Sequence, residues 1–131
     1  MQLKYLIHLL VCILCFSSCG SDDEVVPVNP PTDLYQTYWE GTITNGAENQ
    51  TQPIKLTFST KDAGEFHVDS SAYSYSMNYS LEGRILNIYD DYTNILDGFW
   101  WIVESRENAM VLKRNFETSD HPDVLDIHRV Y

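Results

Sequence analysis

Strict alternation of large and small side chains over residues 72–81 constrains the fold of this chain more than any other sequence feature. The large residues are Tyr73, Tyr75, Met77, Tyr79 and Leu81, and serine or asparagine occupies the positions between them. Because successive side chains of a β-strand point to opposite faces of the sheet, a strand would place all the large residues on one face. The pattern therefore predicts a β-strand over Ala72–Leu81, with one apolar and one polar face.

Shorter runs of the same kind recur between Leu34 and Tyr131, and no segment there shows a sustained helical period. The predicted strands are Tyr38–Thr44, Pro53–Ser59, Gly64–Asp69, Ala72–Leu81, Arg84–Tyr89, Gly98–Glu104, Ala109–Arg114 and Leu125–Tyr131. Their connectors are short, which indicates antiparallel neighbours, because parallel pairs need long crossovers. We therefore expect an all-β, eight-stranded, antiparallel up-and-down barrel, whose closure removes its free edges. A two-sheet β-sandwich is the alternative.

Several short motifs along these predicted strands occur together in one known kind of domain. They include Trp39-Glu40-Gly41, Gly64-Glu65-Phe66, the run from Tyr79 to Ile88 around Gly83, and Trp100-Trp101-Ile102. Over roughly Tyr38–Arg114 this order resembles the lipocalin-like (calycin-type) domain of small bacterial lipoproteins. The resemblance implies an eight-stranded barrel, often with a ligand cavity, but it implies no particular substrate.

The first 19 residues have the organisation of an export signal. Lys4 precedes an apolar run, Tyr5–Phe16, that is too short to span a bilayer but has the length of a signal-peptide core. Phe16-Ser17-Ser18-Cys19 follows and resembles the lipobox of bacterial lipoproteins, in which the cysteine is acylated. We therefore expect residues 1–18 to be a cleaved signal peptide and Cys19 to carry the lipid anchor. An ordinary secretory signal that contains a cysteine is the alternative.

Acidic residues and prolines dominate residues 19–33. The sequence from Gly20 to Glu24 is Gly-Ser-Asp-Asp-Glu, which resembles the signal that sends some Gram-negative lipoproteins to the outer face of the outer membrane. Three prolines then follow before Leu34 and favour an extended chain. We expect a tether over residues 19–33 that holds the domain of residues 34–131 at the cell surface, or otherwise at the periplasmic face. A solvated acidic spacer without a sorting role is the alternative.

Composition excludes several classes of function. The chain has 8 Lys and Arg against 19 Asp and Glu, so it offers no basic patch for nucleic acid. All three cysteines lie within the first 19 residues, which excludes disulfides and thiolate chemistry in the domain. His67, His121 and His128 have no metal-ligand spacing, and the acidic loop from Asp90 to Gly98 lacks the order of an EF-hand. With no serine nucleophile motif either, we predict neither an enzyme, a metal nor a cofactor.

The tyrosine-rich strand supplies the first candidate site. If its large face points inward, Tyr73, Tyr75, Met77 and Tyr79 would line a cavity with apolar rings and polar hydroxyl tips. Such a lining suits a small apolar or amphipathic ligand. Plain filling of the core is the alternative, because an eight-stranded barrel is barely wide enough for its own side chains.

The second candidate site lies where three predicted strands, between residues 84 and 114, are apolar on both faces. Phe99 and Trp101 share one face of their strand and Trp100 the other. Since the outside of a barrel should be polar, the extra apolar face predicts cover by residues 115–124 or by another chain. A register slip of one residue would exchange the two faces, so the sequence does not decide which of the two tryptophans points into the barrel. We expect a non-catalytic interaction or envelope-accessory module, or alternatively a binding protein for a small ligand in the barrel.

Overall fold

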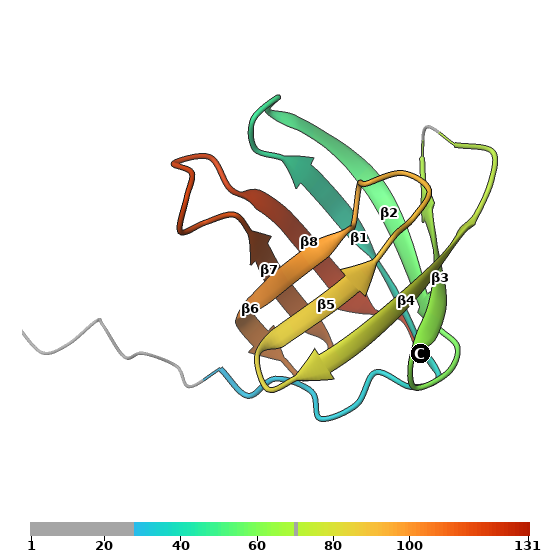
Figure 1. The fold of residues 1–131 in the computed structure, drawn as a ribbon. Coiled ribbons are helices and arrows are strands. Elements are labelled where there is room, and N and C mark those ends of the chain that lie inside the picture. Colours follow the sequence, from blue (N-terminus) through green and yellow to red (C-terminus); the bar gives the residue numbers. More distant parts are fainter. Residues whose placement is uncertain (1–27, 70) are drawn as a thin grey trace, which may run out of the picture.

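Eight antiparallel strands follow one another in chain order and close into a barrel (Figure 1). The strands are β1 (Thr37–Asn45), β2 (Gln50–Phe58), β3 (Ala63–Val68), β4 (Tyr75–Glu82), β5 (Ile85–Tyr89), β6 (Gly98–Arg106), β7 (Ala109–Arg114) and β8 (Asp123–Arg129). Each strand pairs with the next, and β8 returns to pair with β1, so that no edge is left free. The up-and-down barrel predicted from the sequence is confirmed, and the two-sheet sandwich is wrong.

The computed structural model describes residues 28–69 and 71–131. The predicted signal peptide (1–18), the predicted acylation site at Cys19 and the first part of the predicted tether lie outside the described residues. No helix in the described part of the chain is long and apolar enough to cross a membrane. The end of the predicted tether contacts the barrel, because Val28 is half-buried and packs against the core.

The alternation over residues 72–81 predicts the wrong starting residue for β4. β4 begins at Tyr75, three residues later than predicted, and the last pair between β3 and β4 joins Phe66 to Tyr75 although β3 continues to Val68. Before Tyr75 the backbone turns instead, and the Ser71 hydroxyl bonds to the backbone of Tyr73. Tyr73 therefore alternates in sequence with the strand residues but belongs to the β3–β4 loop.

Apolar side chains fill the inside of the barrel. Alternate residues of each strand point inward, and the most deeply buried are Ile54, Leu56, Phe58, Phe66, Val68, Leu86, Ile88, Trp100, Ile102, Met110, Leu112, Leu125 and Ile127. Gly41 has a special role, since a Cβ there would lie 1.9 Å from the carbonyl oxygen of Asp126. The Trp39-Glu40-Gly41 motif thus places a large side chain in the core and lets β8 approach β1 closely two residues later.

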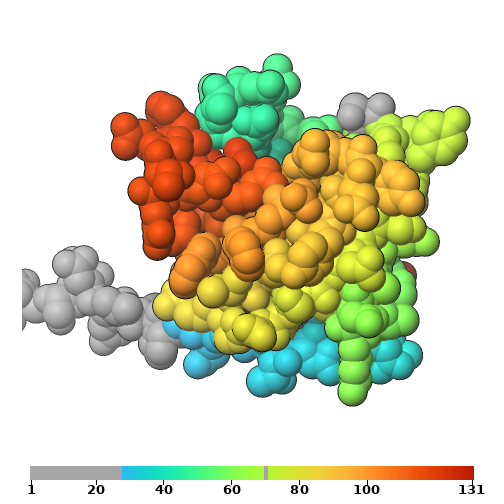
Figure 2. Space-filling view, in the orientation of Figure 1, coloured from blue at the N-terminus to red at the C-terminus, as the bar shows by residue number. Residues whose placement is uncertain are grey.

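The two ends of the barrel differ. At the lower end in Figure 1, the described N-terminal residues run beneath the strands and bury Leu34. The Thr37 hydroxyl donates to the Leu34 carbonyl at 2.5 Å and accepts the Trp39 indole N–H at 2.8 Å, which fixes this closure. The upper end carries the β1–β2, β3–β4, β5–β6 and β7–β8 loops. Figure 2 shows the β7–β8 loop, in red, beside β6 and the β5–β6 loop, in orange.

Candidate functional site: a mouth cavity and an outer aromatic groove

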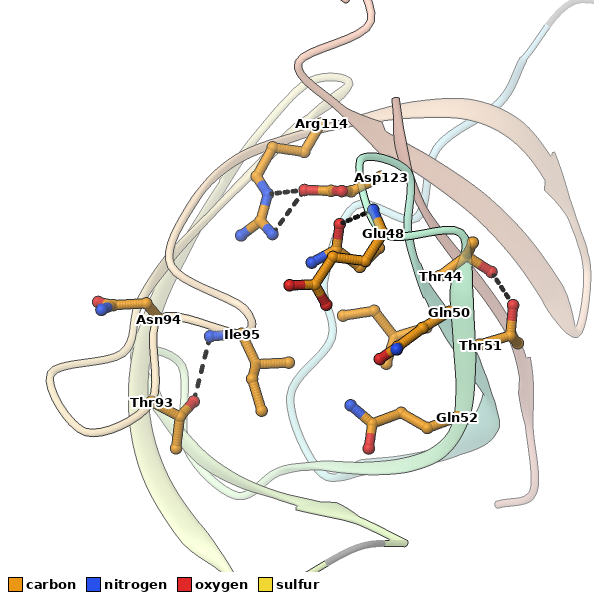
Figure 3. A pocket seen from close by; sticks show the side chains of 12 residues that line it. Thr44, Glu48, Gln50, Thr51, Gln52, Thr93, Asn94, Ile95, Arg114 and Asp123 are labelled. Carbon is orange, nitrogen blue, oxygen red and sulfur yellow. Dashed lines mark hydrogen bonds and ion pairs between the residues drawn. The ribbon is translucent and has the colours of Figure 1, made fainter. Parts of the chain in front are cut away.

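A polar cavity of about 540 Å³ opens at the mouth of the barrel (Figure 3). Its lining comes from the β1–β2 hairpin, the β5–β6 loop and the facing ends of β7 and β8, and includes Thr44, Asn45, Glu48, Gln50, Thr51, Gln52, Thr93, Asn94, Arg114 and Asp123. The apolar residues Ile43 and Ile95 also line it. Because amide and hydroxyl groups dominate, the cavity suits a ligand that forms hydrogen bonds rather than a purely apolar one.

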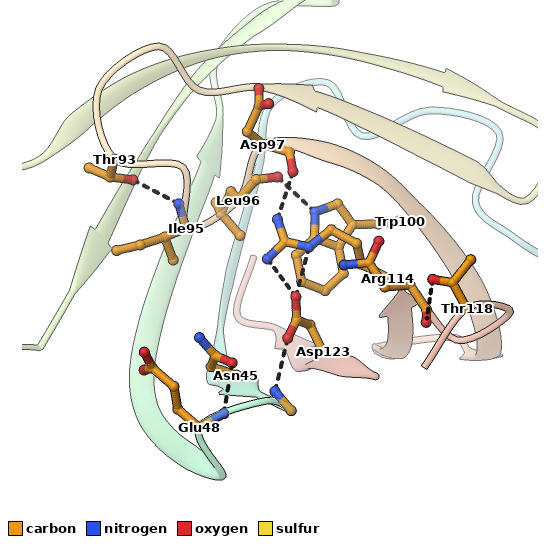
Figure 4. A network of polar contacts seen from close by, with 12 residues as sticks. Asn45, Glu48, Thr93, Ile95, Leu96, Asp97, Trp100, Arg114, Thr118 and Asp123 are labelled. Carbon is orange, nitrogen blue, oxygen red and sulfur yellow. Dashed lines mark hydrogen bonds and ion pairs between the residues drawn. The ribbon is translucent and has the colours of Figure 1, made fainter. Parts of the chain in front are cut away.

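Arg114 links the β5–β6 loop to the ends of β7 and β8 in one network (Figure 4). Its Nε and Nη2 donate to Asp123 Oδ2 at 2.9 and 2.7 Å, and its Nη1 donates to the Asp97 carbonyl at 2.6 Å. The guanidinium also lies over the ring of Trp100, 4.4 Å from the centroid. The Trp100 indole N–H donates in turn to the Leu96 carbonyl at 2.7 Å. Arg114 therefore holds the β5–β6 loop against the ends of β7 and β8.

The same network fixes the β1–β2 hairpin. Asp123 Oδ1 accepts the backbone N–H of Gly46 at 2.9 Å, so that one carboxylate ties this hairpin to Arg114. Gly46 lies so close to the β7–β8 loop that a Cβ there would be 2.0 Å from the His121 carbonyl oxygen. The β1–β2 hairpin, the β5–β6 loop and the facing ends of β7 and β8 are therefore joined by Arg114 and Asp123, and we call this connected set the braced rim.

The acidic loop between β5 and β6 uses its carboxylates to hold its own backbone. Asp90 is buried and accepts the backbone N–H groups of Tyr92 and Thr93 as well as the Thr93 hydroxyl. Asp97 accepts the backbone N–H of Asp90 at 3.0 Å. Among the described residues, no group of three or more histidine, cysteine or acidic side chains is arranged to hold a metal ion.

The predicted ligand residues of the tyrosine-rich strand take two different roles. Met77 and Tyr79 point into the core, where the Tyr79 ring meets Phe58 edge to face at 4.7 Å. The Tyr79 hydroxyl donates to the Thr60 carbonyl, and burial raises the pKa of this phenol. This part of the face therefore packs as core at the closed end of the barrel.

The other two tyrosines lie toward the open end. Tyr75 is half-buried, and its ring centroid lies 5.4 Å from that of Phe66. Its hydroxyl shares a hydrogen bond of 3.0 Å with the Ser71 hydroxyl. Tyr73 is exposed in the β3–β4 loop. None of the four predicted ligand residues lines the mouth cavity or the groove described next.

Trp100 and Trp101 lie on opposite faces of β6. Trp100 is fully buried in the barrel, whereas Trp101 is 37% exposed and Phe99 is 62% exposed on the outside. Phe116 of the β7–β8 loop meets Trp101 edge to face, with ring centroids 6.0 Å apart and planes at 85°. Residues 115–124 thus supply one ring of cover, and the rest of this face meets solvent. We call Tyr89, Phe99, Trp101 and Phe116 the outer aromatic face.

A groove of about 550 Å³ runs through the outer aromatic face. It lies between β6, the β5–β6 loop and the β7–β8 loop, and its walls include the rings of Phe99, Trp101 and Phe116. Polar side chains complete the lining, namely Asn94, Asp97, Arg114, Asn115, Glu117 and Thr118. An aromatic groove with a few polar groups at its edge has the composition of a recognition site.

Two histidines that are far apart in the sequence lie at opposite ends of one row of side chains on another part of the surface. The strand register puts His128, Glu40, Lys55 and His67 in one row across β8, β1, β2 and β3. They line a shallow cavity of about 290 Å³ together with Asp69. Lys55 and Glu40 lie between the two histidines and form an exposed ion pair, with 3.7 Å between Lys55 Nζ and Glu40 Oε1.

Sequence reasoning missed Phe116 and the pairing of Arg114 with Asp123. The only signal for either was the position of residues 115–124 as a possible cover. No family model, curated protein or solved structure matches this chain. The functional inference therefore comes from the geometry of the barrel.

Proposed function

We propose that this chain is a non-catalytic interaction module of the bacterial envelope, tethered to the outer membrane through lipid on Cys19. The outer aromatic face is its contact surface. The observation that carries the proposal is the exposure of Phe99 and Trp101 on a barrel whose inside is already filled. Rings that the core does not need, gathered around a groove, are typical of a surface that a partner covers.

The energetics favour a partner on this face. Burying apolar surface contributes about 25 cal/mol per Å², and an aromatic side chain offers roughly 150–250 Å². The exposed parts of Phe99, Trp101 and Phe116 could therefore supply several kcal/mol to an interface. The braced rim adjacent to the groove lowers the entropic cost of binding, because Arg114 already holds the loop on one side.

Site-specific photocrosslinking in living cells tests the contact surface. A photoreactive residue in place of Phe99 should give a discrete crosslinked product, because this side chain lies in the groove. The same residue in place of Tyr73 is the matched control, since Tyr73 is an exposed aromatic residue that does not line the groove. Equal products from both positions, or none from Phe99, would contradict the proposal.

The anchor is tested separately. Cys19→Ala should abolish acylation and leave an uncleaved or mislocalised precursor, which mass spectrometry of membrane fractions detects. Changing Asp22, Asp23 and Glu24 together to alanine should move the protein to the periplasmic side and protect it from protease added to intact cells. Unchanged membrane attachment of Cys19→Ala would refute the lipid anchor, and equal digestion would reduce the three acids to a spacer.

Binding of a small ligand is the second candidate function, and the mouth cavity favours it. The core fills the barrel below, so a ligand would lie above Ile43, among the amide and hydroxyl groups of the rim. Native mass spectrometry of the purified protein should then show a bound small molecule. Gln50→Leu should abolish this added mass, whereas a bare mass from the unaltered protein would argue against the ligand role.

A further inference from the structure

The groove in the outer aromatic face has aromatic walls that meet almost at a right angle. The Trp101 and Phe116 rings lie 85° apart in plane, with 6.0 Å between their centroids, and Phe99 adds a third ring from the start of β6. In this edge-to-face pair the edge of one ring covers part of the face of the other, and both rings line the groove. The ring faces that remain uncovered attract cations, because the face of an aromatic ring carries negative charge density.

Two carboxylates share the groove with these rings. Asp97 and Glu117 line it, and neither forms an ion pair with another described residue. The Asp97 carboxylate accepts the backbone N–H of Asp90. Arg114 also lines the groove, but Asp123 already neutralises it through two hydrogen bonds. Lys113 lies beside Trp101 in the strand register but does not line the groove. The groove thus combines aromatic walls with two carboxylates that pair with no cationic side chain of the described residues.

We infer that this groove receives a lysine or arginine side chain from a partner polypeptide. The inference rests on the proposed interaction function and names the chemistry of the partner. A cationic side chain matches both parts of the groove, since its charge faces Asp97 and Glu117 while its aliphatic stem packs on the rings. The formal net charge of the whole chain, −11, also draws a basic partner toward this surface.

Other occupants fit less well. A second copy of the chain would bring together two molecules that each carry a formal net charge of −11. A purely apolar segment would bury Asp97 and Glu117 without replacing the water they lose. An anionic segment would meet the same two carboxylates directly.

Peptide titrations of the purified chain test the inference. The probes are the blocked peptide Gly-Gly-Lys-Gly-Gly and the same peptide with an acetylated lysine side chain, which removes the charge and keeps the stem. The readout is the indole N–H signal of Trp101 by nuclear magnetic resonance. The indole groups of Trp39 and Trp100 donate to internal acceptors and serve as reference signals in the same spectrum. At low salt, the lysine peptide should bind about fivefold or more tightly than its acetylated form.

Matched variants locate the effect in the groove. Glu117→Gln should weaken binding of the lysine peptide by about threefold, because it removes one charge and keeps the shape of the side chain. Phe116→Leu should weaken it by about fivefold, because it removes an aromatic wall. Tyr73→Leu is the control for an exposed aromatic residue elsewhere and should leave the titration unchanged.

Equal binding of the lysine and acetyl-lysine peptides would overturn the inference. That result would leave the proposed function intact if photocrosslinking from position 99 still succeeded, so the two can fail separately. Tetramethylammonium chloride gives a further comparison. If it bound more than tenfold more tightly than the lysine peptide, the groove would be assigned to a small quaternary ammonium compound and the polypeptide partner would be rejected.

Discussion

Trp100 and Trp101 are neighbours in the sequence, yet the barrel treats them in opposite ways. The inner ring of Trp100 is surrounded by core side chains, donates its N–H to Leu96 and carries the Arg114 guanidinium on its face. The outer ring of Trp101 packs against Phe116, and 37% of the residue stays exposed. The different burial of the two rings indicates that Trp100 stabilises the fold, whereas Trp101 is held at the surface.

A second aromatic contact on the outer face of the barrel can be compared with the Trp101–Phe116 contact. Tyr38 on β1 stacks on Tyr131 near the C-terminus, with ring centroids 5.2 Å apart and planes at 15°. There the chain itself covers an outer ring and also supplies an acceptor for its hydroxyl, Glu40 Oε1 at 2.8 Å. Trp101 has one ring of cover and remains more than a third exposed, which is why we assign its face to a partner.

The largest predicted effect compares the two tryptophans directly. Trp100→Ala should lower the free energy of unfolding by about 3–5 kcal/mol, because it leaves a cavity in a filled core and removes the partner of the Leu96 carbonyl. Trp101→Ala should cost about 1 kcal/mol or less. Urea denaturation of both variants measures the difference. Equal large losses would mean that β6 is buried on both sides and would break the comparison.

The next effect compares two ion pairs. The side chains of Arg114 and Asp123 are only 16% and 13% exposed, whereas those of Lys55 and Glu40 are 56% and 38% exposed. Arg114→Met leaves the poorly solvated Asp123 carboxylate without its ion-pair partner, so it should lower the free energy of unfolding by about 2–4 kcal/mol. Lys55→Met should change stability by less than about 0.5 kcal/mol. The same urea denaturation measurements decide between them, and similar losses would show that the rim network does not brace the mouth.

The smallest effect concerns the covered ring on the outer face. Burial, the hydrogen bond to Glu40 and the negative charge of that residue raise the pKa of Tyr38 to about 12. Because the folded state holds this proton more tightly than the unfolded chain, the stabilisation is complete below about pH 10 and is lost as the pH rises towards 12. Glu40→Gln should lower the Tyr38 pKa, as followed by its ring signals in a pH titration. No change would show that Glu40 does not govern this phenol.

The fold was predictable because its signal is local. Alternation of apolar and polar residues marks each strand, and short connectors dictate antiparallel pairing, so the barrel followed from the chain alone. The start of β4 was not predictable in this way. Tyr73 fits the alternation, and β3 extends far enough to face it, but a local turn in which the Ser71 hydroxyl bonds to the Tyr73 backbone takes it out of the strand.

The candidate sites were predictable only in part, for a related reason. β6 is apolar on both faces, so periodicity cannot orient it, and a bulge between Ile102 and Glu104 shifts its pairing with β7 by one residue. Pairing of Trp100 with Leu86 on β5 settles the orientation. Arg114 and Asp123 face each other across the last pair of β7 and β8, which becomes visible only once the register is known. The alternation around Tyr79 indicated a shared face but could not distinguish a cavity from a core.

The central claim is that the outer aromatic face serves contact and is dispensable for folding. The most direct measurement repeats the crosslinking from position 99 in cells whose protein also carries Trp101→Ser and Phe116→Ser. The account predicts that the protein still accumulates in a folded form while the crosslinked product disappears. A product of unchanged yield, or a protein that no longer folds, would contradict it.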